Sequence, residues 1–130
     1  MKAWTLRFRA VDKKNFEELR KGIKAVETRA ASVKYQPIEK GDTLIFTCSK
    51  DKFSKTITKK THFKSINAML KKIQFRKIMP NLKTAEEVKK AYYSYPNYKE
   101  KIQKFGILMS KIWVNIQKRL LKVVDWVVII

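Results

Sequence analysis

The spacing of apolar side chains changes repeatedly along this chain, and the order of these changes restricts the fold more than any other feature. Residues 4–10 alternate between apolar and polar side chains, as in a half-buried strand. Apolar residues at helical spacing follow Asp12, a candidate N-cap, and Gly22 is placed to end that helix. Further strands are predicted over residues 24–30, 43–48, 52–63 and 106–114, and further helices after the N-cap candidates Ser65 and Thr84.

This order contains no repeated unit and no regular alternation of strand and helix. It therefore argues against a fold built from βαβ units and predicts the α+β class. We expect one domain with a small, curved, mostly antiparallel sheet or β-barrel, decorated by about three helices. Phe16, Leu19 and Ile23 should form the apolar face of the first helix, and Trp4 and Trp113 should be buried in the core.

Positive charge dominates the composition and is uneven along the chain. The 130 residues include 31 Lys and Arg against 11 Asp and Glu, a formal net charge of +20. Residues 1–49 carry 11 basic and 6 acidic side chains, whereas residues 50–130 carry 20 and 5. Such an excess repels itself in a compact chain, which favours a polyanionic partner, above all nucleic acid. The general basicity of a Lys-rich proteome and an anionic membrane surface are the two alternatives.

Cysteine and histidine are too scarce for several kinds of chemistry. The single Cys48 excludes an internal disulfide and a zinc site built on cysteines, and the single His62 removes most metal and Ser-His chemistry. We therefore expect no cofactor and no metal. The first residues lack the continuous apolar core of a signal peptide, and no uncharged apolar stretch reaches about 18 residues. The expectation is a cytoplasmic protein without a transmembrane segment.

Three charged residues lie close together in a segment, residues 22–30, that otherwise reads as a buried strand. Glu27 and Arg29 have the same parity, so on a strand both project from one face. Lys24 has the opposite parity and joins them only if the chain turns or bulges directly after Gly22. The group would then be a carboxylate between two cations, suited to hold a phosphate or the edge of a base.

Two sequence motifs, which follow one another along the chain, resemble those of the ASCH domain, a family within the PUA-like group of β-barrels. The family signature G-x-K-x-x-E-x-R is matched by Gly22, Lys24, Glu27 and Arg29, and its later G-D-x-(I/L)-x-F strand is matched by Gly41, Asp42, Leu44 and Phe46. The resemblance covers residues 1–114, which we take as an ASCH-like domain. Residues 115–130 remain as a basic and apolar C-terminal tail whose role the sequence leaves open.

The resemblance implies a small barrel with a cleft lined by the signature residues, a cleft proposed in this family to bind RNA. Some ASCH proteins are amidohydrolases that remove the acetyl group from acetylated cytidine, using a Lys and a Thr of the signature strand and a separate Glu. Lys24 matches that Lys, but Glu27 stands at the position of the Thr. A ribonuclease activity has also been proposed in the family. The residues themselves favour binding over catalysis, with Lys24 and Glu27 as the acid-base pair if the protein is an enzyme.

Further candidate contacts to RNA lie outside the signature. They are Arg7, Arg9, Lys50, Tyr93 and Tyr98. The two arginines share the polar face of the first strand, and the lysine follows the strand that would form the rim of the cleft. The two tyrosines lie among lysines, a combination suited to stacking on unpaired bases. Tyr92 and Tyr95 have the helical spacing of core residues and are expected to be buried.

The function predicted from the sequence is therefore binding of RNA, or of a modified nucleotide within it, by a Lys-Glu-Arg cleft and a basic surface. The alternative is a small hydrolase that acts on a modified nucleoside or on RNA. For residues 115–130 we expect packing on the domain, self-association or contact with another surface.

Overall fold

The computed structural model of the protein describes residues 1–114. The tail predicted to pack or self-associate, residues 115–130, lies outside the described residues. The elements, in chain order, are β1 (Ala3–Phe8), the 3-10 turn η1 (Ala10–Asp12), α1 (Lys13–Lys21), β2 (Val26–Ala30), β3 (Thr43–Cys48), β4 (Asp51–Phe63), α2 (Ile66–Lys72), α3 (Phe75–Ile78), α4 (Ala85–Ser94), α5 (Tyr98–Phe105) and β5 (Ile107–Ile112).

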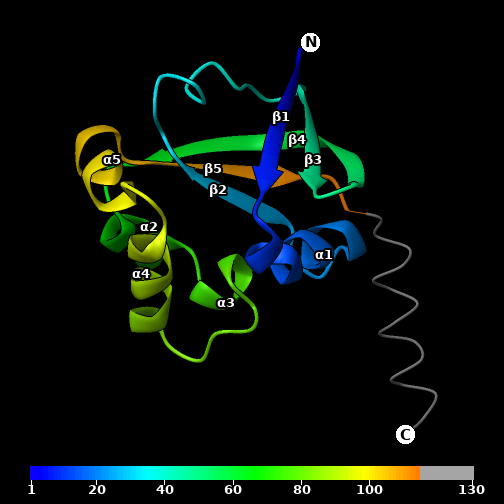
Figure 1. The fold of residues 1–130 in the computed structure, drawn as a ribbon. Helices are drawn as coiled ribbons and strands as arrows, with labels where there is room; N and C mark the ends of the chain where they lie inside the picture. Colours follow the sequence, from blue (N-terminus) through cyan, green and yellow to red (C-terminus); the bar gives the residue numbers. More distant parts are fainter. Residues whose placement is uncertain (115–130) are drawn as a thin grey trace, which may run out of the picture.

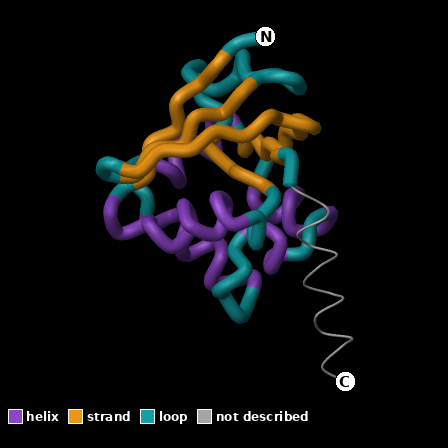
Figure 2. The backbone as a smooth tube through the Cα atoms, turned by 90° about the vertical axis from the view of Figure 1, so that its right-hand side faces the viewer, coloured by secondary structure: helices purple, strands orange, loops and turns teal. Residues whose placement is uncertain are grey.

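The five strands form one curled sheet in the order β1-β3-β4-β5-β2. β1 and β3 are parallel, while the other neighbours are antiparallel, so the predicted mostly antiparallel sheet is confirmed. The sheet curls into a half-barrel whose edge strands, β1 and β2, do not pair with each other. Helices gather on one side of the strands, and the loop over residues 31–42 runs on the other side (Figures 1 and 2).

Helices are more numerous than the sequence predicted. Residues 1–114 contain five α-helices, against the expected three or so, because α3 and α5 were not anticipated. α3 has only four residues, and α5 buries only Ile102, so neither carries a clear apolar period. No helix within residues 1–114 is long and apolar enough to cross a bilayer.

Two of the predicted helix starts show their capping bonds. The Ser65 hydroxyl accepts a hydrogen bond from the backbone N–H of Ala68 at 3.1 Å, and the Thr84 hydroxyl accepts one from Glu87 at 3.2 Å. Asp12 does hold the N-cap position of α1, but its carboxylate accepts from the side chain of Arg9 instead of from the helix. This difference places Asp12 beside the end of β1.

The core consists of two clusters of buried side chains. One packs α2, α3, α4 and α5 against β2, β4 and β5, and the other packs α1 and the loop over residues 31–42 against β1 and β3. β5 contributes to both, since Ile107 belongs to the first cluster and Leu108 to the second. A strand buried on both faces explains the nearly continuous apolar sequence of β5.

Two residues predicted to be in the core are exposed. Ile23 is 51% exposed, because the left-handed Gly22, at φ 78°, ends α1 before it and turns the chain away from the helix face. Trp113 is 54% exposed, because it follows the buried Ile112 and projects from the opposite face of the extended chain. Trp4 lies half-buried at the edge of the second cluster.

Asp42, the acidic residue of the G-D motif, ties the start of β1 to the turn before β3. Its carboxylate accepts hydrogen bonds from the backbone N–H of Lys2 at 3.0 Å, the indole N–H of Trp4 at 2.8 Å and the backbone N–H of Glu39 at 3.0 Å. These bonds, led by the one from Lys2, lower the pKa of Asp42. The motif therefore has a structural role at the parallel pairing of β1 with β3.

We predict that Asp42→Asn lowers the melting temperature at neutral pH and weakens the acid sensitivity of the fold. A carboxyl group whose pKa is lowered by folding stabilises the native state above its ordinary pKa of about 3.9. That stabilisation disappears as the pH falls through the lowered pKa. Thermal melts at several pH values measure both effects, with Asp51→Asn, at the exposed start of β4, as the matched control. Equal acid sensitivity in wild type and Asp42→Asn would contradict this account.

Candidate functional site

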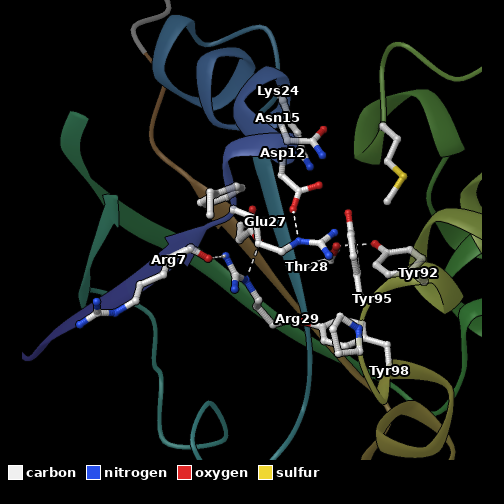
Figure 3. Close-up of a pocket in the computed structure, with 14 residues that line it drawn as sticks. Arg7, Asp12, Asn15, Lys24, Glu27, Thr28, Arg29, Tyr92, Tyr95 and Tyr98 are labelled. Atoms are coloured by element: carbon white, nitrogen blue, oxygen red, sulfur yellow. Dashed lines mark hydrogen bonds and ion pairs between the residues drawn. The ribbon is translucent and has the colours of Figure 1, made fainter. Parts of the chain in front are cut away.

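A cavity of about 170 Å³ lies where the sheet fails to close, between the edge strands β1 and β2. The end of β1 and the start of α1 form one wall, and β2 forms another. The end of α4, the segment that joins it to α5 and the start of α5 supply aromatic side chains (Figure 3). The residues that line it are Arg7, Phe8, Arg9, Asp12, Asn15, Lys24, Glu27, Thr28, Arg29, Met79, Tyr92, Tyr95, Pro96 and Tyr98.

Arg29 spans the gap between the two edge strands. Its Nε donates to Glu27 Oε1 at 2.9 Å, and its terminal NH2 group donates to the carbonyl oxygen of Arg7 on β1 at 3.3 Å. The guanidinium also lies 5.0 Å from the ring centre of Phe8. Burial alone would lower the pKa of Arg29. The charge of Glu27, its hydrogen bond and the smaller effects of Tyr98 and Tyr35 together outweigh burial, so the pKa of Arg29 is raised. Arg29 therefore remains a cation in the cavity wall.

One carboxylate oxygen of Glu27 has no hydrogen-bond partner within residues 1–114. The residue is 5% exposed, and its Oε1 is engaged by Arg29. Its Oε2 is buried and has no hydrogen-bond partner among the described residues. A buried acceptor without a donor is costly, whereas a ligand N–H in the cavity would satisfy it. Glu27 thus presents an acceptor to whatever occupies the cavity.

Lys24 reaches the site through the turn after Gly22. The backbone N–H of Lys24 donates to the carbonyl oxygen of Glu18 at 3.0 Å, which holds the chain against the end of α1 before β2 begins at Val26. This turn brings Lys24 to the cavity that Glu27 and Arg29 also line, although Lys24 has the opposite strand parity. Lys24 is only 4% exposed. Loss of hydration lowers its pKa more than the nearby charges of Glu27 and Glu18 raise it.

Glu18 is a second buried acid beside Lys24 that the sequence did not single out. It is 7% exposed, and its Oε1 has no hydrogen-bond partner among the described residues. Its neighbour Glu17 is more exposed and pairs with Arg20, so the residue types of α1 give no signal that separates the two acids. Only the way α1 packs on the sheet identifies Glu18 as the buried one.

Tyrosines form the side of the cavity opposite α1. The hydroxyl of Tyr92 hydrogen-bonds the hydroxyl of Thr28, and both groups are buried. Tyr95 meets Tyr92 and Tyr98 edge to face, with ring centres 6.3 Å and 5.1 Å away. Burial raises the pKa of Tyr95 to about 12 and raises that of Tyr98 as well, so both phenols, neutral already at physiological pH, ionise only at a still higher pH. The predicted burial of Tyr92 is confirmed, but Tyr95 is only half-buried and lines the cavity.

Arg9 and Asp12 close the mouth of the cavity near α1. Arg9 Nε donates to Asp12 Oδ2 at 2.8 Å, and its guanidinium lies 5.1 Å from the ring centre of Tyr95. The hydrogen bond with Asp12 raises the pKa of Arg9. Cation, carboxylate and aromatic ring therefore form one connected group at the entrance.

The structure brings most, but not all, of the predicted site residues together. Lys24, Glu27, Arg29, Arg7, Arg9 and Tyr98 line the cavity. Arg7 offers its backbone carbonyl, while its side chain points away from the site (Figure 3). Lys50 lies in the exposed turn between β3 and β4, and Tyr93 is 47% exposed under Lys99, so neither lines this cavity.

Several cavity residues were not predicted from the sequence. The sequence predicts Asp12 as a helix cap and Tyr95 as a core residue. It predicts no role for Asn15 or Met79, yet all four line the cavity. None belongs to the signature, and each is carried to the cavity by tertiary packing. Within residues 1–114 no group of three or more His, Cys, Asp or Glu side chains is placed to hold a metal ion.

Comparison with known proteins identifies the family. The family model described as the ASCH domain matches residues 10–118, so the chain belongs to this family, within the PUA-like fold. A crystal structure of the hypothetical protein PH0355 has a TM-score of 0.74 and 25% identity, over 86% of this chain and 97% of that one. A solution structure of protein PF0455 from Pyrococcus furiosus has a TM-score of 0.65 and 24% identity, over 85% and 94%. No curated protein matches the sequence.

We predict that the hydroxyls of Thr28 and Tyr92 stabilise the fold as a coupled pair. Tyr92→Phe or Thr28→Val alone should lower the free energy of unfolding by about 1–3 kcal/mol, because each leaves a buried hydroxyl without its partner. The double variant should lose less than the sum of the two. Chemical denaturation of the four proteins measures the coupling, with the exposed Tyr93→Phe as control. Strictly additive losses would show that the two hydroxyls do not act together.

Proposed function

We propose that this protein binds single-stranded RNA and places one unpaired base in the cavity between β1 and β2. Membership of the ASCH family, which is often linked to RNA binding, supports the class of ligand. The observation that carries the proposal is the buried Oε2 of Glu27, an acceptor without a donor inside a cavity lined by aromatic and cationic side chains. A base edge with an N–H group supplies the missing donor.

The size of the cavity fits a single base. A cavity of roughly 150 Å³ holds one benzene ring, and this one measures about 170 Å³. Its walls include Phe8, Tyr95 and Tyr98, which offer surfaces for a flat ring. The carboxylate of Glu27 accepts hydrogen bonds and cannot donate them. The exocyclic amino group of cytosine donates to it, whereas uracil presents the acceptor O4 there and keeps only its ring N3–H as a donor, so cytosine suits the site better.

The charge of the chain supports a second, less selective part of the binding. The net charge of +20 provides an electrostatic attraction to any polyphosphate chain, and this attraction weakens as the salt concentration rises. Lys50, Tyr93 and the lysines of β4 are candidates for such contacts outside the cavity. In this account the basic surface supplies affinity, and Glu27 supplies the choice of base.

We predict that Glu27→Gln reverses the base preference. Arg29 Nε donates to Oε1 at 2.9 Å, so it should fix the amide oxygen of Gln at that position and leave the NH2 group facing the cavity. Wild type should prefer short oligocytidine over oligouridine by about tenfold, and the variant should favour oligouridine. Affinities measured by fluorescence anisotropy at two salt concentrations test this, with Glu86→Gln on α4, whose side chain is 77% exposed, as control.

Two outcomes would contradict the proposal. One is equal affinity of wild type and Glu27→Gln for both oligonucleotides in a variant that circular dichroism shows to be folded. The other is the absence of RNA binding at low salt. Equal affinity for RNA and DNA, unchanged in the variant, would assign the binding to the general basic surface alone.

A specific feature of Lys24 supports the alternative function, hydrolysis of a modified nucleoside. Burial lowers the pKa of Lys24, which increases the fraction of neutral amine near physiological pH. A neutral amine beside the carboxylate of Glu27 can accept a proton from the water that attacks the acetyl carbonyl, and the reaction releases acetate and the free amino group of cytidine. The position of Glu27, where acetylcytidine amidohydrolases of the family have a Thr, argues against this alternative.

If the alternative holds, wild type should deacetylate N4-acetylcytidine, and Lys24→Met should not. Methionine keeps most of the buried volume of the lysine chain, so the variant tests the amine separately from packing. The rate should increase as the pH rises through the lowered pKa of Lys24, because the amine must be neutral to accept a proton. Chromatographic separation of cytidine from its acetylated form measures the rate. No turnover by the wild type would exclude this reaction.

A further inference from the structure

A second, larger cavity adjoins the first across the pair Arg9 and Tyr95. It measures about 400 Å³ and lies between the start of α1, the segment before α4 and the end of α4. The two cavities share Arg9, Asp12, Asn15, Met79 and Tyr95 in their walls. The second cavity therefore continues the first on the side of α1.

The size of the first cavity makes this continuation important. Sites that enclose drug-sized ligands measure roughly 300–1,000 Å³, so a cavity of about 170 Å³ accommodates a base but not its sugar and phosphate. The remainder of a bound nucleotide must leave through the mouth of the cavity. The second cavity is large enough to receive it.

The positions of the basic side chains also favour the second cavity as the place of the phosphate. In the shared wall, Arg9 is already paired with Asp12. Lys14, in the wall of the second cavity alone, forms no ion pair with a carboxylate of residues 1–114. Arg7, the other basic residue near the mouth, directs its side chain away from the site (Figure 3). A phosphate attached to a base in the first cavity would therefore find in Lys14 a cation that has no carboxylate partner within residues 1–114.

We propose that the second cavity holds the phosphate and the neighbouring nucleotide of the base bound in the first, so that the unit recognised is a dinucleotide. This inference rests on the proposed function. Lys14 binds the phosphate that links the two nucleotides. Tyr95, held under the guanidinium of Arg9, separates the two bases, and the planar guanidinium of Arg9 is the group on which the second base can stack.

Calorimetric titration with cytidine and with the dinucleotides CpU and UpC tests the inference. At least one dinucleotide should bind wild type about five- to tenfold more tightly than cytidine, as expected for one charged hydrogen bond and partial stacking. Lys14→Gln should remove most of this gain and leave the affinity for cytidine unchanged. Lys13→Gln is the matched control, because this exposed neighbour lines neither cavity.

The outcomes separate this inference from the function on which it rests. If cytidine binds but neither dinucleotide binds more tightly, or if the gain survives in Lys14→Gln, the second cavity is not a nucleotide site. If Arg7→Gln removes the gain and Lys14→Gln does not, the phosphate leaves along β1 and the inference is wrong. If none of the three ligands binds, the proposed function fails and the inference fails with it.

Discussion

Glu27 and Arg29 form an ion pair on β2, and this pair holds together the gap at which the half-barrel stays open. Either charge alone, buried in the wall of a small cavity, would be strongly destabilising. Together they are neutral overall, and Arg29 uses its remaining donors to reach the carbonyl oxygen of Arg7 on β1. Arg29 therefore connects two strands that share no ladder, and the cavity lies at this connection.

The same arrangement determines what the cavity offers to a ligand. The tyrosines are neutral at physiological pH, and burial raises their pKa further, so the aromatic wall presents flat rings and hydroxyl groups that can donate hydrogen bonds. Arg29 remains charged, whereas burial lowers the pKa of Lys24. Within residues 1–114, Glu27 is left with one oxygen that has no hydrogen-bond donor. A small heterocycle with an amino group satisfies that oxygen, and the basic surface attracts the chain to which the heterocycle is attached.

Sequence reasoning found the residues whose neighbours are local and missed those that tertiary packing delivers. Strand parity placed Glu27 and Arg29 on one face, and the turn after Gly22 brought Lys24 to them. By contrast, helical spacing predicted Tyr95 for the core and Tyr93 for base stacking. The packing of α4 on α5, and of α5 on β2, instead places Tyr95 in the cavity wall and leaves Tyr93 outside it. The prediction that Trp113 lies in the core was wrong for a different reason. The residue type favoured burial, but the alternation of side chains along the extended chain places Trp113 outside.

The most direct test of this account is a nuclear magnetic resonance titration of the isotope-labelled protein with short oligocytidine at low salt. The account predicts that the largest changes in amide chemical shift occur at Thr28 and Arg29 on β2, at Phe8 at the end of β1, and at Tyr95. Changes confined to the lysines of β4, with the amides of β2 unmoved, would contradict it, because RNA would then bind the basic surface without entering the cavity.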